Sequence, residues 1–205
     1  MNSGEADEGG LERLATLSDG IFAIAMTLLV LDIHVTPGLE AVAFRRMVHG
    51  LLPNIGAYGL SFAILAGVWR DHRRILQLAG PLGTLSMRLA LAGLGVIALL
   101  PFPTTMLSEY ASQSLAVVVY AGTIIVIDLL QLALLLSIRR GPERARPSDE
   151  RVGRKIVMDL GTNIVVFGAT VPIAFASPSA AIWTWVSLLP VRMVLGRREA
   201  ARGRR

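Results

Sequence analysis

An arginine, a serine and an aspartate lie inside a long apolar segment near the start of the chain. Arg13 is followed by Ser18 and Asp19, and the residues after Gly20 are almost entirely apolar. A membrane-crossing helix needs about 20 apolar residues, and the segment 11–33 reaches that length only when these polar residues are included. Ionisable groups are costly inside a membrane and usually have a function there. The sequence therefore predicts a polar cluster at one end of a spanning helix.

A buried carboxylate at Asp19 needs partners that donate hydrogen bonds or carry positive charge. The end of the second apolar segment supplies Trp69, Arg70, His72 and Arg73. In a helical bundle these residues would lie at the same depth as the aspartate. We expect Trp69 and His72 to donate hydrogen bonds toward Asp19 and so to fix the tilt of the first helix.

The composition is typical of an all-α polytopic membrane protein. Of the 205 residues 53% are hydrophobic and 17% are charged, and the mean hydropathy is +0.59. Residues 1–10 are acidic and contain no basic group, unlike a secretory signal peptide, so we expect a disordered N-terminus and a retained first helix. The chain has no cysteine, which excludes disulfides and thiolate metal sites.

Six apolar segments predict a single six-helix transmembrane domain over residues 1–205. Basic residues follow the second, fourth and sixth segments, which places both termini in the cytoplasm by the positive-inside rule. Arg45 and Arg46, in the first outer loop, break this pattern. The expected spans are 11–33, 48–70, 85–107, 115–138, 156–176 and 180–195.

The basic residues lie at helix ends and do not form a folded basic domain, although the pI is about 10.6. Binding to nucleic acid is therefore not expected. The sequence predicts a cytoplasmic loop at 139–155 and a basic cytoplasmic tail at 196–205. Anionic membrane lipid is the expected partner of the loop.

One face of the first helix is a ladder of apolar side chains with a single hydroxyl. At about 100° per residue, Ser18 and Asp19 point away from this ladder. The ladder either faces lipid or an ordinary core, or it lines a pore in which apolar rings form a constriction. Its members are Leu17, Gly20, Ile24, Thr27, Leu28 and Leu31.

Carboxylates occur in the fourth and fifth segments as well. Asp128 is either a proton-relay group or a buried partner of Arg88 or Asn163. Asp159 and Asn163 share a helix face and are interpreted as interhelical hydrogen-bonding groups.

The outer end of the first segment carries Asp32, directly after the last apolar position of the ladder. The aspartate either concentrates cations at a pore mouth or pairs with Arg45 or Arg46. His34 and His49 have no ligand-like spacing to acidic residues, so no metal site is expected.

The motif R-x-x-x-L-S-D-G at residues 13–20 resembles the R-x-x-x-F-S-D-G signature of the transmembrane protein 175 family, the endosomal and lysosomal potassium channels of animals and their bacterial relatives. The segments W-R-D-H-R at 69–73 and L-L-P-F-P-T at 99–104 fit the same family. Leu17 stands where phenylalanine is usual. The resemblance covers the first half of the chain specifically.

The resemblance implies a potassium-permeable cation channel with its pore lined by the first helix. It places the narrowest ring at Ile24, further rings at Leu28 and Leu31, and the hydroxyl associated with potassium preference at Thr27. It also implies a homotetramer that needs no cofactor. Animal members have serine where this chain has Ala23, which suggests modest selectivity for potassium over sodium. The resemblance does not decide between a channel that conducts protons and one that does not.

Two alternatives remain from the residues alone. A proton-coupled transporter would use Asp128, Asp159 and His72, and its flux would need a pH gradient. A membrane scaffold would bind lipid through its arginine-rich loop and tail. An enzyme is not expected, because no nucleophile and base pair or phosphate-binding loop occurs at a meaningful spacing.

Overall fold

The computed structural model describes residues 3–80, 82–140 and 149–187, and every regular element in these ranges is helical. The all-α expectation is confirmed for this part of the chain. The elements are α1 (Ser3–Leu28), the 3-10 helix η1 (Leu29–Asp32), α2 (Ala41–Gly50), α3 (Leu52–Gln77), α4 (Thr84–Leu99), α5 (Pro101–Glu109), α6 (Ser114–Arg140) and α7 (Asp149–Ala176), followed by helical residues 178–187.

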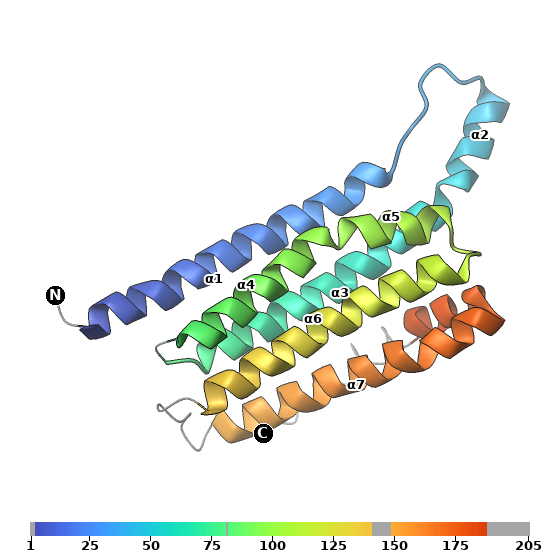
Figure 1. Cartoon of the computed structure of the whole chain (residues 1–205). Coiled ribbons are helices and arrows are strands. Elements are labelled where there is room, and N and C mark those ends of the chain that lie inside the picture. The colour runs from blue at the N-terminus through green and yellow to red at the C-terminus, as the bar shows by residue number, and fades with distance from the viewer. Residues whose placement is uncertain (1–2, 81, 141–148, 188–205) are drawn as a thin grey trace, which may run out of the picture.

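The long helices run side by side as a bundle, with α5 continuing the line of α4 and α2 extending from the start of α3 (Figure 1). Helix α1 packs against α3 and α4, and α6 packs against α4 and α7. Within the described ranges, five helical segments are long and apolar enough to cross a membrane. The chain is therefore a multi-pass membrane protein. These segments are Gly9–Leu31, Ala41–Gln77, Thr84–Glu109, Ser114–Arg140 and Glu150–Ala176.

Several boundaries differ from those predicted. Helix α1 already begins at Ser3, within the stretch 1–10 for which disorder is expected from the sequence. Helix α3 ends at Gln77 and not at residue 70, because Ile75 and Leu76 continue its buried face.

The expected loop at 139–155 is shorter than predicted, since α6 reaches Arg140 and α7 starts at Asp149. Residues 188–195 of the last predicted span and the basic tail at 196–205 lie outside the described residues.

Hydroxyl groups link α3, α5 and α6 inside the bundle. The hydroxyls of Ser61 and Tyr120 are 3.0 Å apart, and Thr104 Oγ1 donates to Ser61 Oγ at 3.0 Å. All three residues are buried. Interhelical hydrogen bonds of this kind help membrane helices to associate where the hydrophobic effect is weak.

An aromatic cluster fixes the last described helix to α6 and α7. The ring of Trp185 lies 5.4 Å from that of Tyr120 and 5.1 Å from that of Phe167, and its indole nitrogen donates to Thr170 Oγ1 at 3.0 Å. Trp185 is 2% exposed, whereas Trp183, two residues earlier, is 68% exposed. One tryptophan of the pair therefore contributes to the core and the other lies on the surface.

We expect Trp185→Ala to lower the free energy of unfolding by about 3 kcal/mol, because it removes a large buried ring and leaves a cavity. Thermal unfolding of the purified protein in detergent measures the change. Trp183→Ala is the matched control and should shift the midpoint little. Equal losses in the two variants would contradict the assignment of Trp185 to the core.

Candidate functional site

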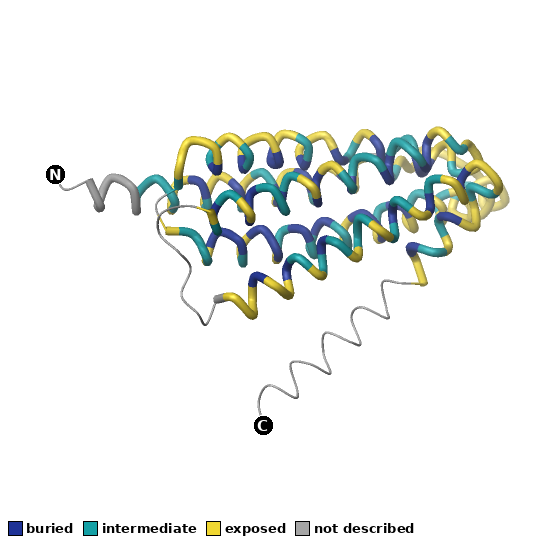
Figure 2. Tube along the Cα trace, turned by 60° about the horizontal axis from the view of Figure 1, so that its bottom comes forward, coloured by how far each residue is buried: buried dark blue, intermediate teal, exposed yellow. Residues whose placement is uncertain are grey.

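Helix α1 has one buried and one exposed face. Phe22 is 1% exposed and Ala25 and Leu29 are also buried, whereas Ile24 is 60% exposed and Leu31 is 63% exposed. Figure 2 shows the same division across the bundle, with buried residues on the inward sides of the helices and exposed residues on the outward sides. The ladder predicted from the sequence therefore lies on the surface of the single chain.

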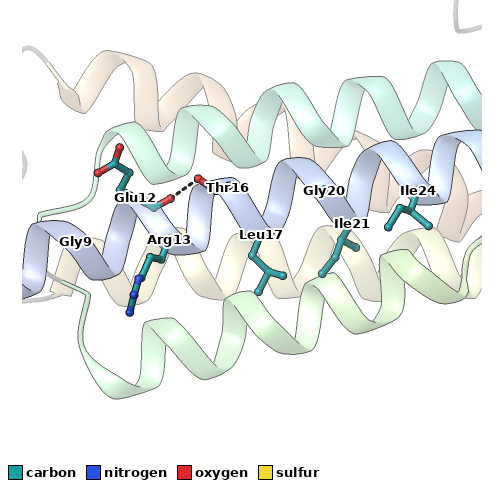
Figure 3. A pocket seen from close by; sticks show the side chains of 8 residues that line it. All are labelled: Gly9, Glu12, Arg13, Thr16, Leu17, Gly20, Ile21 and Ile24. Atoms are coloured by element: carbon teal, nitrogen blue, oxygen red, sulfur yellow. Dashed lines mark hydrogen bonds between the residues drawn. The ribbon is translucent and has the colours of Figure 1, made fainter.

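The first turns of this exposed face form a shallow open groove. Arg13, Leu17, Ile21 and Ile24 project from the same side of α1 (Figure 3). Gly9, Glu12, Thr16 and Gly20 also line the groove. Every residue that lines the groove belongs to α1, so one wall must come from outside this chain if the groove is to be enclosed.

Thr27 lies on the same face, one turn beyond Ile24. Its hydroxyl donates to the carbonyl oxygen of Ile24 at 2.8 Å, and the residue is exposed. Because the hydrogen is donated within the helix, both lone pairs of the hydroxyl oxygen remain as acceptors on this exposed face. Such an oxygen can accept from water or contact a cation. Asp32 is the last residue of η1, and its side chain lies outside the described residues.

The opposite side of α1 meets α3 through a polar cluster. The indole nitrogen of Trp69 donates to Asp19 Oδ1 at 2.8 Å. A guanidinium nitrogen of Arg73 lies 3.7 Å from Asp19 Oδ2, and the guanidinium carbon is 5.5 Å from the centre of the Trp69 ring. The Asp19 side chain is 42% exposed, so this ion pair contributes little to stability by itself.

His72 occupies the buried part of the same cluster. It was expected to donate to Asp19, but its Nε2 lies 3.1 Å from Ser18 Oγ. Ser18 points into the bundle and is 1% exposed, whereas Asp19 is rotated by about 100° toward the rim, where Trp69 reaches it. The imidazole therefore pairs with the neighbouring residue of the motif.

The second ring nitrogen of His72 connects α3 to α6. Nδ1 lies 3.1 Å from Gln131 Oε1, and Gln131 Nε2 donates to the carbonyl oxygen of Val68 at 3.0 Å. Because the amide nitrogen is used on Val68, the amide oxygen accepts the hydrogen on Nδ1. Nε2 of this tautomer is an acceptor, so the Ser18 hydroxyl shares its single hydrogen between Nε2 and the carbonyl oxygen of Leu14, which lies 2.7 Å away, one turn earlier in α1. One imidazole thus links α1, α3 and α6.

Two members of the predicted cluster lie elsewhere. Arg13 and Gly20 line the exposed groove together with Ile24, and a methyl group added at Gly20 would meet no atom of this chain within 4 Å. The two residues therefore belong to the exposed face of α1. Packing within the chain does not explain why position 20 is glycine.

Gln131 was missed as a partner of His72. The sequence signal was an amide within a mainly apolar helix, which must find a hydrogen-bonding partner inside the bundle. Asp128, one turn earlier in α6, is fully buried, whereas Asp159 in α7 is partly exposed. The relay function considered for these two aspartates stays a prediction.

We expect His72→Ala to lower the free energy of unfolding by about 1 to 3 kcal/mol, because it removes two interhelical hydrogen bonds and leaves a cavity beside Phe22. Thermal unfolding in detergent measures the loss. His49→Ala, which replaces an exposed histidine of α2, is the control and should change little. A His72 variant as stable as the control would contradict the linking role of the imidazole.

The part of the chain that contains this site is similar in sequence to known potassium channels. Residues 13–101 match the model of the family described as "Endosomal/lysosomal potassium channel TMEM175". A protein of Streptomyces collinus named as a potassium channel is 34% identical over 125 residues, which are 61% of this chain and 59% of that protein. A potassium channel of Chamaesiphon minutus is 34% identical over 123 residues, which are 58% of this chain and 61% of that protein.

The matched parts are therefore less than two thirds of each relative. The fold extends the similarity further along the chain. A crystal structure described as a lysosomal potassium-selective channel TMEM175 homolog from Chamaesiphon minutus superposes with a TM-score of 0.79 at 25% identity, and it covers 91% of this chain and 97% of that one. Residues 13–101, which contain Ser18, Asp19, Trp69 and His72, therefore match the TMEM175 family, and the fold of the chain resembles that of a solved TMEM175 homolog.

Proposed function

We propose that this protein is a passive, potassium-permeable cation channel whose pore is lined by the exposed face of α1. The observation that carries the proposal is the division of α1 into two faces. One face is anchored to α3 and α6 through Ser18 and His72, and the other leaves Ile24 exposed. A helix held in a fixed rotation can present a defined line of side chains to an ion.

The chemistry of the exposed face favours a pore over a surface that only contacts lipid. The groove has Arg13, Glu12 and Thr16 near one end, and the Thr27 hydroxyl interrupts the apolar face near the other. A helix that faced only lipid would have no need of these polar groups in line with its apolar ladder. A ring of Ile24 side chains would form a hydrophobic constriction that controls the hydration of a passing ion.

Enclosure of such a pore requires several copies of α1 around one axis. We propose a homotetramer, in which four exposed α1 faces form the wall that the single chain lacks. Helix α1 lies along one side of the bundle (Figure 1), so its exposed face is accessible to other copies of the chain. Leu28 and Leu31 would form further apolar rings, and Asp32 would stand at the mouth.

Potassium is proposed as the permeant ion because the named bacterial relatives and the superposed crystal structure are described as potassium channels. We propose that the Thr27 oxygen is the polar group that favours potassium. Ala23 provides no second ring of hydroxyl groups, so we propose that the selectivity for potassium over sodium is modest. The distribution of basic residues supports a cell-membrane protein with both termini in the cytoplasm.

Ile24→Ala should raise potassium flux several-fold or reduce the preference for potassium, because a smaller side chain widens and hydrates the constriction. The measurement is dye-reported flux into proteoliposomes under potassium and sodium gradients set in turn. Ile55→Ala is the matched control, since Ile55 is 47% exposed but lies on α3. Its flux should equal that of the unsubstituted protein.

Two results would count against the proposal. Equal flux in the Ile24 and Ile55 variants would remove Ile24 from the pore. Flux that required an imposed pH gradient, and that was lost on Asp128→Asn, would indicate a proton-coupled transporter. Verified reconstitution and protein-free vesicles exclude leakage as the source of the signal.

A further inference from the structure

Helix α2 is the part of the fold that the proposed pore does not use. None of its residues is buried, and Phe44 and Val48 are 48% and 42% exposed. Figure 1 places α2 at the far end of the bundle from the N-terminus. At about 100° per residue, one side of the helix carries Phe44, Met47 and Val48, and the opposite side carries Arg45, Arg46 and His49.

The depth of α2 follows from the length of α3. Together α2 and α3 form a helical segment of 37 residues, Ala41–Gln77, which contains a stretch apolar enough to cross a membrane. At 1.5 Å per residue the whole segment measures about 55 Å along the helix. The hydrocarbon core is only about 30 Å thick, or about 20 helical residues. Counting 20 residues back from Arg70, where the charged end of α3 begins, reaches Gly50, the last residue of α2. Helix α2 therefore lies in the headgroup layer on the side of the membrane away from the polar cluster.

We propose that α2 is an interfacial helix that binds anionic phospholipid headgroups at this surface. Phe44 and Val48 enter the acyl boundary, and the guanidinium groups of Arg45 and Arg46 contact lipid phosphates. Both arginines are exposed, so their charges are available to a ligand. The proposal also explains why these two residues depart from the positive-inside pattern, because here they serve as lipid ligands.

The size of the apolar side favours lipid over a second copy of the chain. Ten residues span about 15 Å and offer three larger apolar side chains. A stable protein interface usually buries about 800 Å² on each partner, which this strip cannot supply by itself. An amphipathic helix of the same kind can lie in a membrane surface, where lipid covers one side and water the other.

The two valines of α2 provide a matched test, because Val48 lies on the apolar side and Val42 lies among the basic residues. The chain has no cysteine, so Val48→Cys and Val42→Cys each introduce a single site for a nitroxide spin label. The full-length labelled proteins are reconstituted into phosphatidylcholine vesicles with or without phosphatidylglycerol. Collision with oxygen and with a water-soluble nickel complex is then measured by electron paramagnetic resonance.

We expect the ratio of oxygen to nickel accessibility to be several-fold higher at position 48 than at position 42. Phosphatidylglycerol should increase this difference, and the double substitution R45Q/R46Q should abolish the increase. Each arginine near an anionic surface favours binding by about fivefold. R151Q/R154Q removes two exposed arginines from the start of α7 and should leave the lipid response intact.

Three results would overturn the proposal. Equal nickel accessibility at positions 42 and 48 in both vesicles would show that α2 does not enter the interface. Shielding of position 48 that is the same in detergent and in every vesicle would indicate a protein partner such as a second copy. Shielding of position 48 from nickel that is the same with and without phosphatidylglycerol would show that α2 contacts lipid but does not recognise anionic headgroups. None of these readouts depends on ion flux, so the proposal is tested separately from the channel.

Discussion

A buried imidazole sets the arrangement of the first helix, and the other features of the proposed pore depend on it. His72 lies within 3.1 Å of Ser18 in α1 and of Gln131 in α6, while it belongs to α3 itself. A polar side chain in a membrane interior has few alternative partners, so its hydrogen bonds restrict both the rotation and the depth of each helix. The Trp69 to Asp19 bond adds a second fixed point at the rim of the bundle.

Fixing the rotation of α1 on one side determines what the other side presents. Ser18, Phe22 and Ala25 turn inward, and Leu17, Ile24 and Thr27 turn outward as a direct consequence of helical geometry. In the single chain the first turns of this outward face, from Gly9 to Ile24, form an open groove. The same division that stabilises the bundle therefore leaves a defined surface, which we propose copies of the chain use to enclose an ion path.

The all-helical class and most of the membrane spans could be predicted from the sequence. The depth at which polar side chains of α1 and α3 contact each other could be predicted as well. These depend on apolar length and on charged or aromatic residues near helix ends, which a sequence records directly. The pairing of His72 with Ser18 in place of Asp19 was not predictable, because adjacent residues differ by about 100° and the rotation of α1 is decided by packing. Gln131 was missed because its level relative to His72 depends on how α6 slides along α3. The helical start of residues 3–10 and the extension of α3 to Gln77 show that hydropathy locates a membrane span better than it locates the ends of a helix.

The most direct test of the central claim is chemical access to the proposed constriction. Ile24→Cys in this cysteine-free chain would place thiols around the axis, where cadmium ions can bridge them. We expect micromolar cadmium to block potassium flux through this variant in proteoliposomes and a chelator to restore it, while Ile55→Cys stays unaffected. Unchanged flux through the Ile24 variant, with its thiols shown to be free and reactive, would contradict a pore lined by α1.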